Sequence, residues 1–482
     1  MSTNETDTIA EGVASTETAQ PPVETPPAEN QNRKQPFPRG FLDTISTGWA
    51  DRPEQLPPAR AQAPYAAARR DAVSAAFPGK RLVLPAGTYK QRSNDTDYPF
   101  RAHSAFSHLT GWASDSVPDS VLVFEPTGDQ GHDVTLYLRE RADRTTAEFY
   151  DDATIGEFWI GPRPALAGVA SDLGLQTAHI DDFDAREGDV ILEKDADLTR
   201  FVSELRLVKD DYEIAQLRLA VEVTGRGFDD IVSDLDRIVE TPRGERAVEG
   251  IFHHRARVEG NGEGYDTIAA SGPHACYLHW TRNDGAVVPG DLVLVDAGVE
   301  VDSLYTADIT RTLPVSGTFT DVQRKVYETV REAADAAFAV AKPGVKFRAV
   351  HEAAMAVIAQ RTAEWGLLPV SAEEALDADR GGQHRRYMVH GTSHHLGLDV
   401  HDCAQARREM YYDGILEPGM VFTIEPGLYF QIDDLTVPEE YRGIGVRIED
   451  DVLVTEDGVE NLSAAIPRTA DEVEAWIARL RS

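Results

Sequence analysis

The chain has 482 residues, 41% of them hydrophobic, and a formal net charge of −35 at pH 7. This length allows two or three domains, and no apolar run approaches the length that a bilayer requires. The charge argues against nucleic acid and anionic membranes as partners, because both repel an acidic surface. The two cysteines, Cys276 and Cys403, imply no disulfide framework and fit a reducing compartment. Neither lies in a nucleophile signature, so each is interpreted as a small core residue.

The chain begins with a segment that is unsuited to a hydrophobic core. Residues 1–36 are rich in Thr, Glu, Pro and Ala, and their few large apolar side chains cannot offset the entropy lost on ordering. This pattern predicts a disordered acidic tail. The segment does not begin with basic residues and contains no hydrophobic run, so it is predicted to be neither a signal peptide nor a membrane anchor. From Phe37 onward, short apolar runs alternate with helical stretches, including Tyr65–Phe77, and residues 37–198 are predicted to form an α/β domain.

Residues 199–482 are predicted to form a second domain. It begins with apolar residues at helical spacing, and strands follow from Gly264. Later helices are expected at 321–341, 347–365 and 471–480. Between the last two, residues 371–386 read as an exposed polar insertion.

Two acids stand at strand ends between Leu292 and Pro314. The apolar run at the start of this stretch ends in Asp296, and twelve residues later Asp308 opens the segment DITRT. A carboxylate at the end of a buried strand is costly to desolvate unless a cation or a donor compensates it. The stretch therefore predicts two strands that bring their acids to a common cation.

Further acids and histidines follow in three motifs. HGTSHHLGLDVHD contains His390, His394 and His401, TIEPGLY contains Glu425, and GVRIEDD contains Glu449. Two Asp, two Glu and one His form an oxygen-rich donor set. Such a set suits manganese, cobalt or iron better than a thiolate-bound structural zinc, and its excess of carboxylates suits two ions.

A weak internal repeat links the two groups of acids. The tripeptide Asp-Ala-Gly at 296–298 and the tripeptide Glu-Pro-Gly at 425–427 each follow a predicted strand. We interpret this as two related halves that offer acids to one shared centre.

In this order, the motifs resemble those of aminopeptidase P, the Xaa-Pro aminopeptidases of the pita-bread metallopeptidase superfamily, which includes prolidase, methionine aminopeptidase and creatinase. The resemblance covers roughly residues 200–482, and NDTDYPFRAHSAFSHLTGW at 94–112 is similar to the amino-terminal domain of the same family. It implies an α+β protein in which a smaller α/β domain precedes a pita-bread catalytic domain.

The resemblance implies a centre of two manganese ions, for which cobalt, iron or zinc are possible substitutes. Asp296 would bind one ion, His394 and Glu425 the other, and Asp308 and Glu449 would bridge them. Glu425 would also be the acid/base, taking a proton from the attacking water and delivering it to the leaving nitrogen.

Further site residues are implied by the same resemblance. His279 and His401 would steady the reaction intermediate, and His401 would also lie near the substrate's proline ring. His390 resembles the histidine of the proline-specific branch, which contacts the proline side of the substrate. Arg447 and Tyr429 would form a hydrogen-bonded relay with the first metal-binding acid; a structural ion pair that orients this acid is the alternative reading.

Trp159, in EFWIGPRP, resembles an aromatic residue that family members present from a neighbouring subunit to cover the active site. An ordinary core or interface tryptophan is the alternative.

The chain departs from the family pattern at two places. The spacing of Asp296 and Asp308 is one residue longer than in many relatives, which places an insertion in the turn VEVDSLYTA; the insertion matters little if this turn is exposed. His395 stands where a bulkier aromatic is common, and would alter the pocket wall or add an imidazole near the metals.

The sequence thus predicts a cytoplasmic Xaa-Pro aminopeptidase that forms a homo-oligomer, a dimer or a tetramer, and acts on peptides with proline second. An Xaa-Pro bond lacks the N–H that other peptidases recognise, and a site that holds the amino group and polarises the carbonyl avoids that need. Prolidase, which cuts only Xaa-Pro dipeptides, is the nearest alternative. A non-catalytic peptide-binding relative and creatinase-like hydrolysis without metal are disfavoured, because all five ligands are present.

Overall fold

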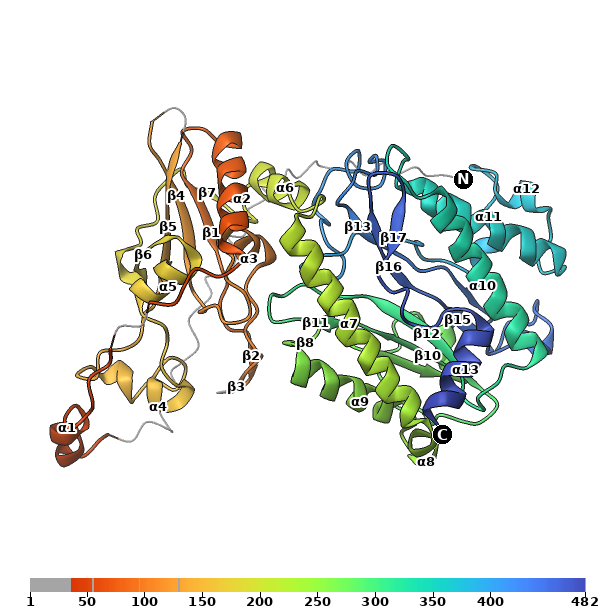
Figure 1. Ribbon diagram of the computed structural model, residues 1–482, viewed down its shortest axis with the longest axis horizontal. Coiled ribbons are helices and arrows are strands. Elements are labelled where there is room, and N and C mark those ends of the chain that lie inside the picture. The colour runs from red at the N-terminus through yellow and green to blue at the C-terminus, as the bar shows by residue number, and fades with distance from the viewer. Residues whose placement is uncertain (1–35, 54–55, 95, 129–130, 482) are drawn as a thin grey trace, which may run out of the picture.

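The computed structural model describes residues 36–53, 56–94, 96–128 and 131–481. All of the predicted acidic tail except residue 36 lies outside the described residues. Figure 1 shows two lobes, a smaller one formed by the first part of the chain and a larger one formed by the rest. No helix in the described part of the chain has the length and apolarity to cross a membrane.

The smaller lobe is built on a mixed sheet of five strands in the order β6-β5-β4-β1-β7. Its strands are β1 (Leu82–Pro85), β4 (Val121–Pro126), β5 (His132–Leu138), β6 (Gln176–His179) and β7 (Val190–Ile191). The central pairs are antiparallel, while β5–β6 and β1–β7 are parallel. Helices α2 (Ala63–Ala76), α3 (Ser104–Thr110) and α5 (Leu166–Leu173) contribute buried apolar side chains to its core. The predicted helix at Tyr65–Phe77 corresponds to α2.

Smaller elements project from this lobe. A hairpin is formed by β2 (Gln91–Ser93) and β3 (Thr96–Asp97), and Figure 1 places α1 (Arg39–Ile45) and α4 (Glu157–Ile160) at the end away from the sheet. Neither α1 nor α4 contains a buried residue.

Helix α6 (Ala196–Glu204) joins the two lobes and contains the predicted boundary between residues 198 and 199. Its buried residues Leu198 and Val202 pack in the core of the smaller lobe, whereas Leu207, just beyond it, packs in the core of the larger one. Three helices then follow: α7 (Asp211–Ser233), α8 (Leu235–Glu240) and α9 (Gly244–Glu259).

The larger lobe contains two antiparallel three-stranded sheets. The first has the order β12-β10-β9 and consists of β9 (Ile268–Ser271), β10 (Leu292–Ala297) and β12 (Ile309–Pro314). The second has the order β13-β16-β17 and consists of β13 (Val421–Ile424), β16 (Asp450–Val454) and β17 (Val459–Asn461). Two short pairs, β8 (Gly262–Glu263) with β11 (Val299–Glu300) and β14 (Gly427–Tyr429) with β15 (Gly445–Arg447), adjoin them. Each half of the proposed internal repeat therefore supplies one sheet.

The predicted later helices are α10 (Asp321–Val340), α11 (Arg348–Glu364) and α13 (Ala470–Leu480). Thr320 and Thr469 cap α10 and α13 in capping boxes, which fixes where these helices start. The insertion at 371–386 is largely exposed, as expected, but it also folds into α12 (Ala372–Ala375) and a 3₁₀ turn (Gln383–Arg386) that buries His384.

Candidate metal centre

Four carboxylates and one imidazole converge on a cavity of about 660 Å³ in the larger lobe. Each comes from the end of a strand or from the loop between the two sheets. Asp296 lies near the end of β10 and Asp308 directly before β12, while Glu425 follows β13 and Glu449 precedes β16. His394 lies in the loop before β13 and lines the same cavity. A larger cavity of about 870 Å³ lies in the smaller lobe and contains no comparable cluster among its described residues.

The pairing of β10 with β12 brings the first two acids together. Asp296 lies opposite Thr310 in this antiparallel register, and the Tyr265 hydroxyl lies 2.7 Å from Asp296 Oδ1 and also within hydrogen-bonding distance of Asp308 Oδ1. His394 Nε2 lies 3.2 Å from Asp308 Oδ2 and 3.8 Å from Glu425 Oε1.

These distances fit a metal site. One ligand atom each from Asp308, His394 and Glu449 lies within 4.8 Å of the other two. A cluster of oxygen ligands with one imidazole suits a hard or borderline divalent cation.

The electrostatics of the cavity also favour cations. Burial raises the pKa of Glu425 to about 8 and the pKa of Glu449 well above its usual range, and neighbouring carboxylates add to both shifts. Burial and Asp296 likewise raise the pKa of Asp308. Burial alone would lower the pKa of His394, but Asp308 and Glu425 outweigh it and raise this pKa to about 9. Divalent cations would relieve this repulsion.

A hydrogen-bonded network orients the acids from behind. Arg447 Nη2 donates to Asp296 Oδ2 at 2.5 Å, and its Nη1 donates to the Tyr429 hydroxyl at 3.1 Å. Arg447 Nε donates to the hydroxyl of Thr310, which in turn donates to Glu449 Oε2 at 2.7 Å. One guanidinium, that of Arg447, therefore makes the contacts of both readings: the hydrogen-bonded relay with Tyr429 and the ion pair that orients Asp296.

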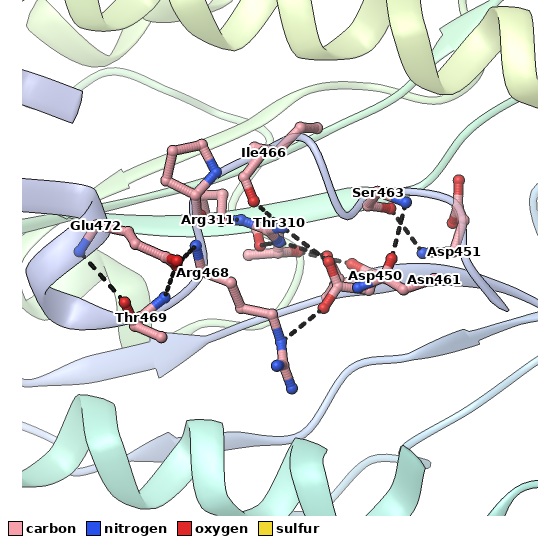
Figure 2. Close-up of polar contacts among 12 residues, drawn as sticks. Thr310, Arg311, Asp450, Asp451, Asn461, Ser463, Ile466, Arg468, Thr469 and Glu472 are labelled. Carbon is pink, nitrogen blue, oxygen red and sulfur yellow. Dashed lines mark hydrogen bonds and ion pairs between the residues drawn. The ribbon is translucent and has the colours of Figure 1, made fainter. Parts of the chain in front are cut away.

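A second arginine stabilises the strands that present the acids (Figure 2). The Arg311 side chain is fully buried, and its Nη2 lies 2.7 Å from Asp450 Oδ1. Its Nη1 donates to the Glu449 carbonyl at 2.7 Å, and Asp451 Oδ2 accepts from the Asp308 N–H at 3.2 Å. Both contacts tie the Asp308 segment to the Glu449 segment.

Three further predicted histidines line the cavity: His279, His390 and His401. His390 Nδ1 donates to the Gly391 carbonyl at 2.7 Å, so its Nε2 accepts from the Tyr429 hydroxyl at 2.8 Å. Burial lowers the pKa of His390 to about 3 and that of His401 to about 4, which keeps both rings neutral. The His401 ring lies 4.2 Å from the His394 ring, centroid to centroid.

The loop that carries His401 is anchored at the junction of the two lobes. Asp402 is buried against Arg206, at 3.0 Å, and Lys209, at 3.2 Å. Asp399 accepts a hydrogen bond from Ser104 of the smaller lobe. The smaller lobe therefore helps to place a histidine of the cavity.

The structure decides two points that the sequence left open. The condition under which the insertion at 299–307 would matter little is not met, because this turn is buried except for Asp302: Glu300 pairs with Arg101, and the Asp302 carbonyl accepts from the Ser114 N–H, both from the first part of the chain. His395 does not belong to the described lining of the metal cavity; it is buried against Phe347 and Tyr411 instead.

Trp159 lies outside the cavity of its own chain. It is 60% exposed on α4, beside the exposed Phe158 and Ile160, and its Nε1 donates to the Tyr150 carbonyl at 2.9 Å. This excludes an ordinary core tryptophan and leaves an exposed apolar surface on α4.

Sequence reasoning missed Tyr265, Thr310, Arg311 and Asp451. The signal for the last three was present, because DITRT and EDD place charged and hydroxyl residues inside buried strands, where each requires a partner. Tyr265 stands in a segment read only as a strand.

Two family models match the chain: aminopeptidase P, N-terminal domain, at residues 66–197, and metallopeptidase family M24, at residues 215–456. Xaa-Pro aminopeptidase 1 of Streptomyces coelicolor is 52% identical over 464 residues, which cover 92% of each chain. The Xaa-Pro aminopeptidase of Escherichia coli is 34% identical over 437 residues, 84% of this chain and 95% of that one.

Solved structures agree with the sequence relatives. A zinc-substituted Escherichia coli aminopeptidase P in complex with product superposes with a TM-score of 0.74 at 32% identity, covering 87% of this chain and 99% of that one. The Pseudomonas aeruginosa aminopeptidase PepP gives a TM-score of 0.73 at 31% identity, covering 86% and 98%. The α+β architecture is therefore the pita-bread fold, and the chain belongs to the aminopeptidase P family of M24 metallopeptidases.

Proposed function

We propose that this protein is a dinuclear Xaa-Pro aminopeptidase that releases the first residue from peptides with proline second. The observation that carries the proposal is the convergence of Asp296, Asp308, His394, Glu425 and Glu449 on one buried cavity that His390 also lines. The preceding aminopeptidase P domain favours this activity over that of a prolidase. The presence of all five ligands argues against a non-catalytic relative.

The donor set supports two divalent ions, with manganese as the first candidate. Asp296 would hold one ion, His394 and Glu425 the other, and Asp308 and Glu449, which line the same cavity, would be shared between them. Such ions, when bound, lower the pKa of a water molecule and polarise the scissile carbonyl.

Glu425 is proposed as the acid/base. Its carboxylate lines the same cavity as the other proposed ligands, so it can take the proton of the attacking water and pass it to the leaving nitrogen. His401, whose ring is neutral, lines the same cavity as His279, and both can donate hydrogen bonds to oxygen atoms of the intermediate. Arg447 keeps the Asp296 carboxylate oriented throughout.

The cavity also fits a proline substrate. The Xaa-Pro bond offers no N–H, so its recognition requires positioning of the free amino group and packing of the ring. We place the amino group near Asp296 and the ring near His390 and His401, with Leu278 and Val400 as apolar cover from the same chain.

A second subunit would complete the cover. The exposed Trp159 supports this proposal, because a large aromatic that is 60% exposed, beside exposed Phe158 and Ile160, is typical of an interface. We therefore propose a homo-oligomer, a dimer or a tetramer. Two buried free thiols fit the proposed cytoplasmic location.

Proline specificity is tested with matched peptides. The metal-stripped protein, reloaded with manganese, is incubated with Xaa-Pro-Yaa and Xaa-Ala-Yaa, and free Xaa is quantified by mass spectrometry. Release from the proline peptide alone supports the proposal. Equal release from both peptides contradicts the role given to His390.

A further inference from the structure

A second, smaller cavity of about 170 Å³ adjoins the metal cavity. The two share His390, Gly391 and Ser393 in their walls. The rest of the small cavity includes Arg348 and His351 of α11 and Arg385 of the insertion at 371–386. We call this cavity the basic pocket.

The lining of the basic pocket contrasts with the acidic composition of the chain. The protein has 82 acidic and 47 basic residues, yet none of the described residues that line the pocket is acidic; two are arginines and two are histidines, whose lowered pKa values favour the neutral ring. A small cavity with this lining attracts anions even on an acidic protein, because local charges dominate at short range.

Arg385 is the cation that remains available in this pocket. Arg348 is already paired, with its Nη1 at 3.1 Å from Asp413 Oδ1. Arg385 donates to the Val389 carbonyl at 2.9 Å, and among the described residues no carboxylate lies within ion-pair distance of it. Its planar group therefore retains donors for a carboxylate.

His351 offers a second donor. Its Nδ1 accepts from the Thr392 N–H at 3.2 Å, so the proton of the neutral ring resides on Nε2. Burial, together with Arg385, lowers the pKa of His351, which favours this neutral form.

Gly391 lies in the wall between the two cavities. This glycine is exposed, and a Cβ added to it would meet only the Ser393 carbonyl, at 3.9 Å. With the proline ring near His390, the next residue of an extended peptide, at about 3.3–3.6 Å per residue, would pass over Gly391 toward Arg385.

From this arrangement we infer that the basic pocket binds a carboxylate on the residue that follows the substrate's proline. The inference rests on the proposed function and deepens it. The carboxylate comes from the C-terminus of a tripeptide or from an acidic side chain at that position. The insertion at 371–386 thus contributes a specificity-determining arginine.

The test compares four peptides with the manganese-loaded wild type and three variants. The peptides are Xaa-Pro-Yaa as the free acid, the same peptide as its amide, and the amides of Xaa-Pro-Asp and Xaa-Pro-Asn. The variants are Arg385→Gln, Arg385→Lys and the control Arg380→Gln, which alters an exposed arginine of the same insertion that does not line the pocket.

For the wild type, kcat/KM is expected to be about fivefold higher for a carboxylate peptide than for its neutral partner, as for a partly exposed charged hydrogen bond. Arg385→Gln should abolish this preference by raising KM with kcat unchanged, Arg385→Lys should retain part of it, and Arg380→Gln should resemble the wild type. If only the free acid is preferred over its amide, the pocket binds the C-terminal carboxylate of the peptide. If the Asp peptide is preferred over the Asn peptide, the pocket binds the acidic side chain.

Two outcomes overturn the inference alone: cleavage by the wild type without a carboxylate preference, or an equal loss for acids and amides in Arg385→Gln. If the metal-loaded wild type cleaves none of the peptides, the proposed function itself is wrong, and the role of the pocket in substrate binding falls with it.

Discussion

Replacing Arg311 by methionine tests whether the buried pair behind the acids stabilises the larger lobe. Arg311 and Asp450 are both completely buried, and the guanidinium also donates to backbone carbonyls (Figure 2). These acceptors are the carbonyls of Thr310, Glu449, Ile466 and Pro467. Methionine keeps much of the side-chain length but provides none of these donors.

The expected loss follows from the contacts. Removing one partner of a buried ion pair costs roughly 3–5 kcal/mol, because the other charge stays buried. Asp450 keeps Arg468 Nε at 2.9 Å, which reduces this penalty, while the four carbonyls lose a charged donor. We therefore expect Arg311→Met to lower the free energy of unfolding by about 3–4 kcal/mol.

Urea denaturation of the metal-free protein, followed by tryptophan fluorescence, measures this change. Arg218→Gln is the matched control, because Arg218 pairs with Glu460 at the surface, with side chains 45% and 44% exposed, and should lose less than about 1 kcal/mol. A loss below about 1 kcal/mol for Arg311→Met, or equal losses for both variants, would refute the reasoning.

Three other changes address the proposed centre. Asp308→Asn should abolish metal binding and turnover together, as measured by elemental analysis and peptide cleavage; activity without metal would contradict the mechanism. Manganese uptake should release protons at pH 7, and fewer protons as the pH rises to 9. Glu425 and His394 have pKa values of about 8 and 9, so they are protonated below these values and must deprotonate to bind metal. Calorimetry in buffers of different ionisation enthalpy measures the number of protons released, and a number that does not change with pH would exclude these groups as ligands. Trp159→Ala should lower kcat/KM with metal content unchanged; unaltered kinetics would leave this residue outside the site.

Much of the metal centre could be predicted because its chemistry is local in the sequence. Asp296 and Glu425 each end an apolar strand, and an acid in that position requires a cation or a donor wherever the strand lies. Helix starts could be predicted for the same reason, since the capping residues Thr320 and Thr469 act within one turn.

What could not be predicted depends on contacts between distant segments. The partners of Arg311 appear only once β12 lies beside the Glu449 segment, about 140 positions further along the chain. Whether the turn at 299–307 is buried could not be decided from the sequence, because its cover comes from the smaller lobe. Composition likewise described the insertion at 371–386 as solvated, whereas its packing near α11 brings Arg385 to a cavity.

The measurement that tests the central claim most directly is turnover of an Xaa-Pro-Yaa tripeptide and of the matching Xaa-Pro dipeptide, side by side. Metal-stripped protein is assayed before and after reconstitution with manganese. We predict metal-dependent cleavage mainly of the tripeptide. Cleavage of the dipeptide alone would identify a prolidase, and cleavage of neither peptide by protein with two bound metal ions would contradict the assignment to proline substrates.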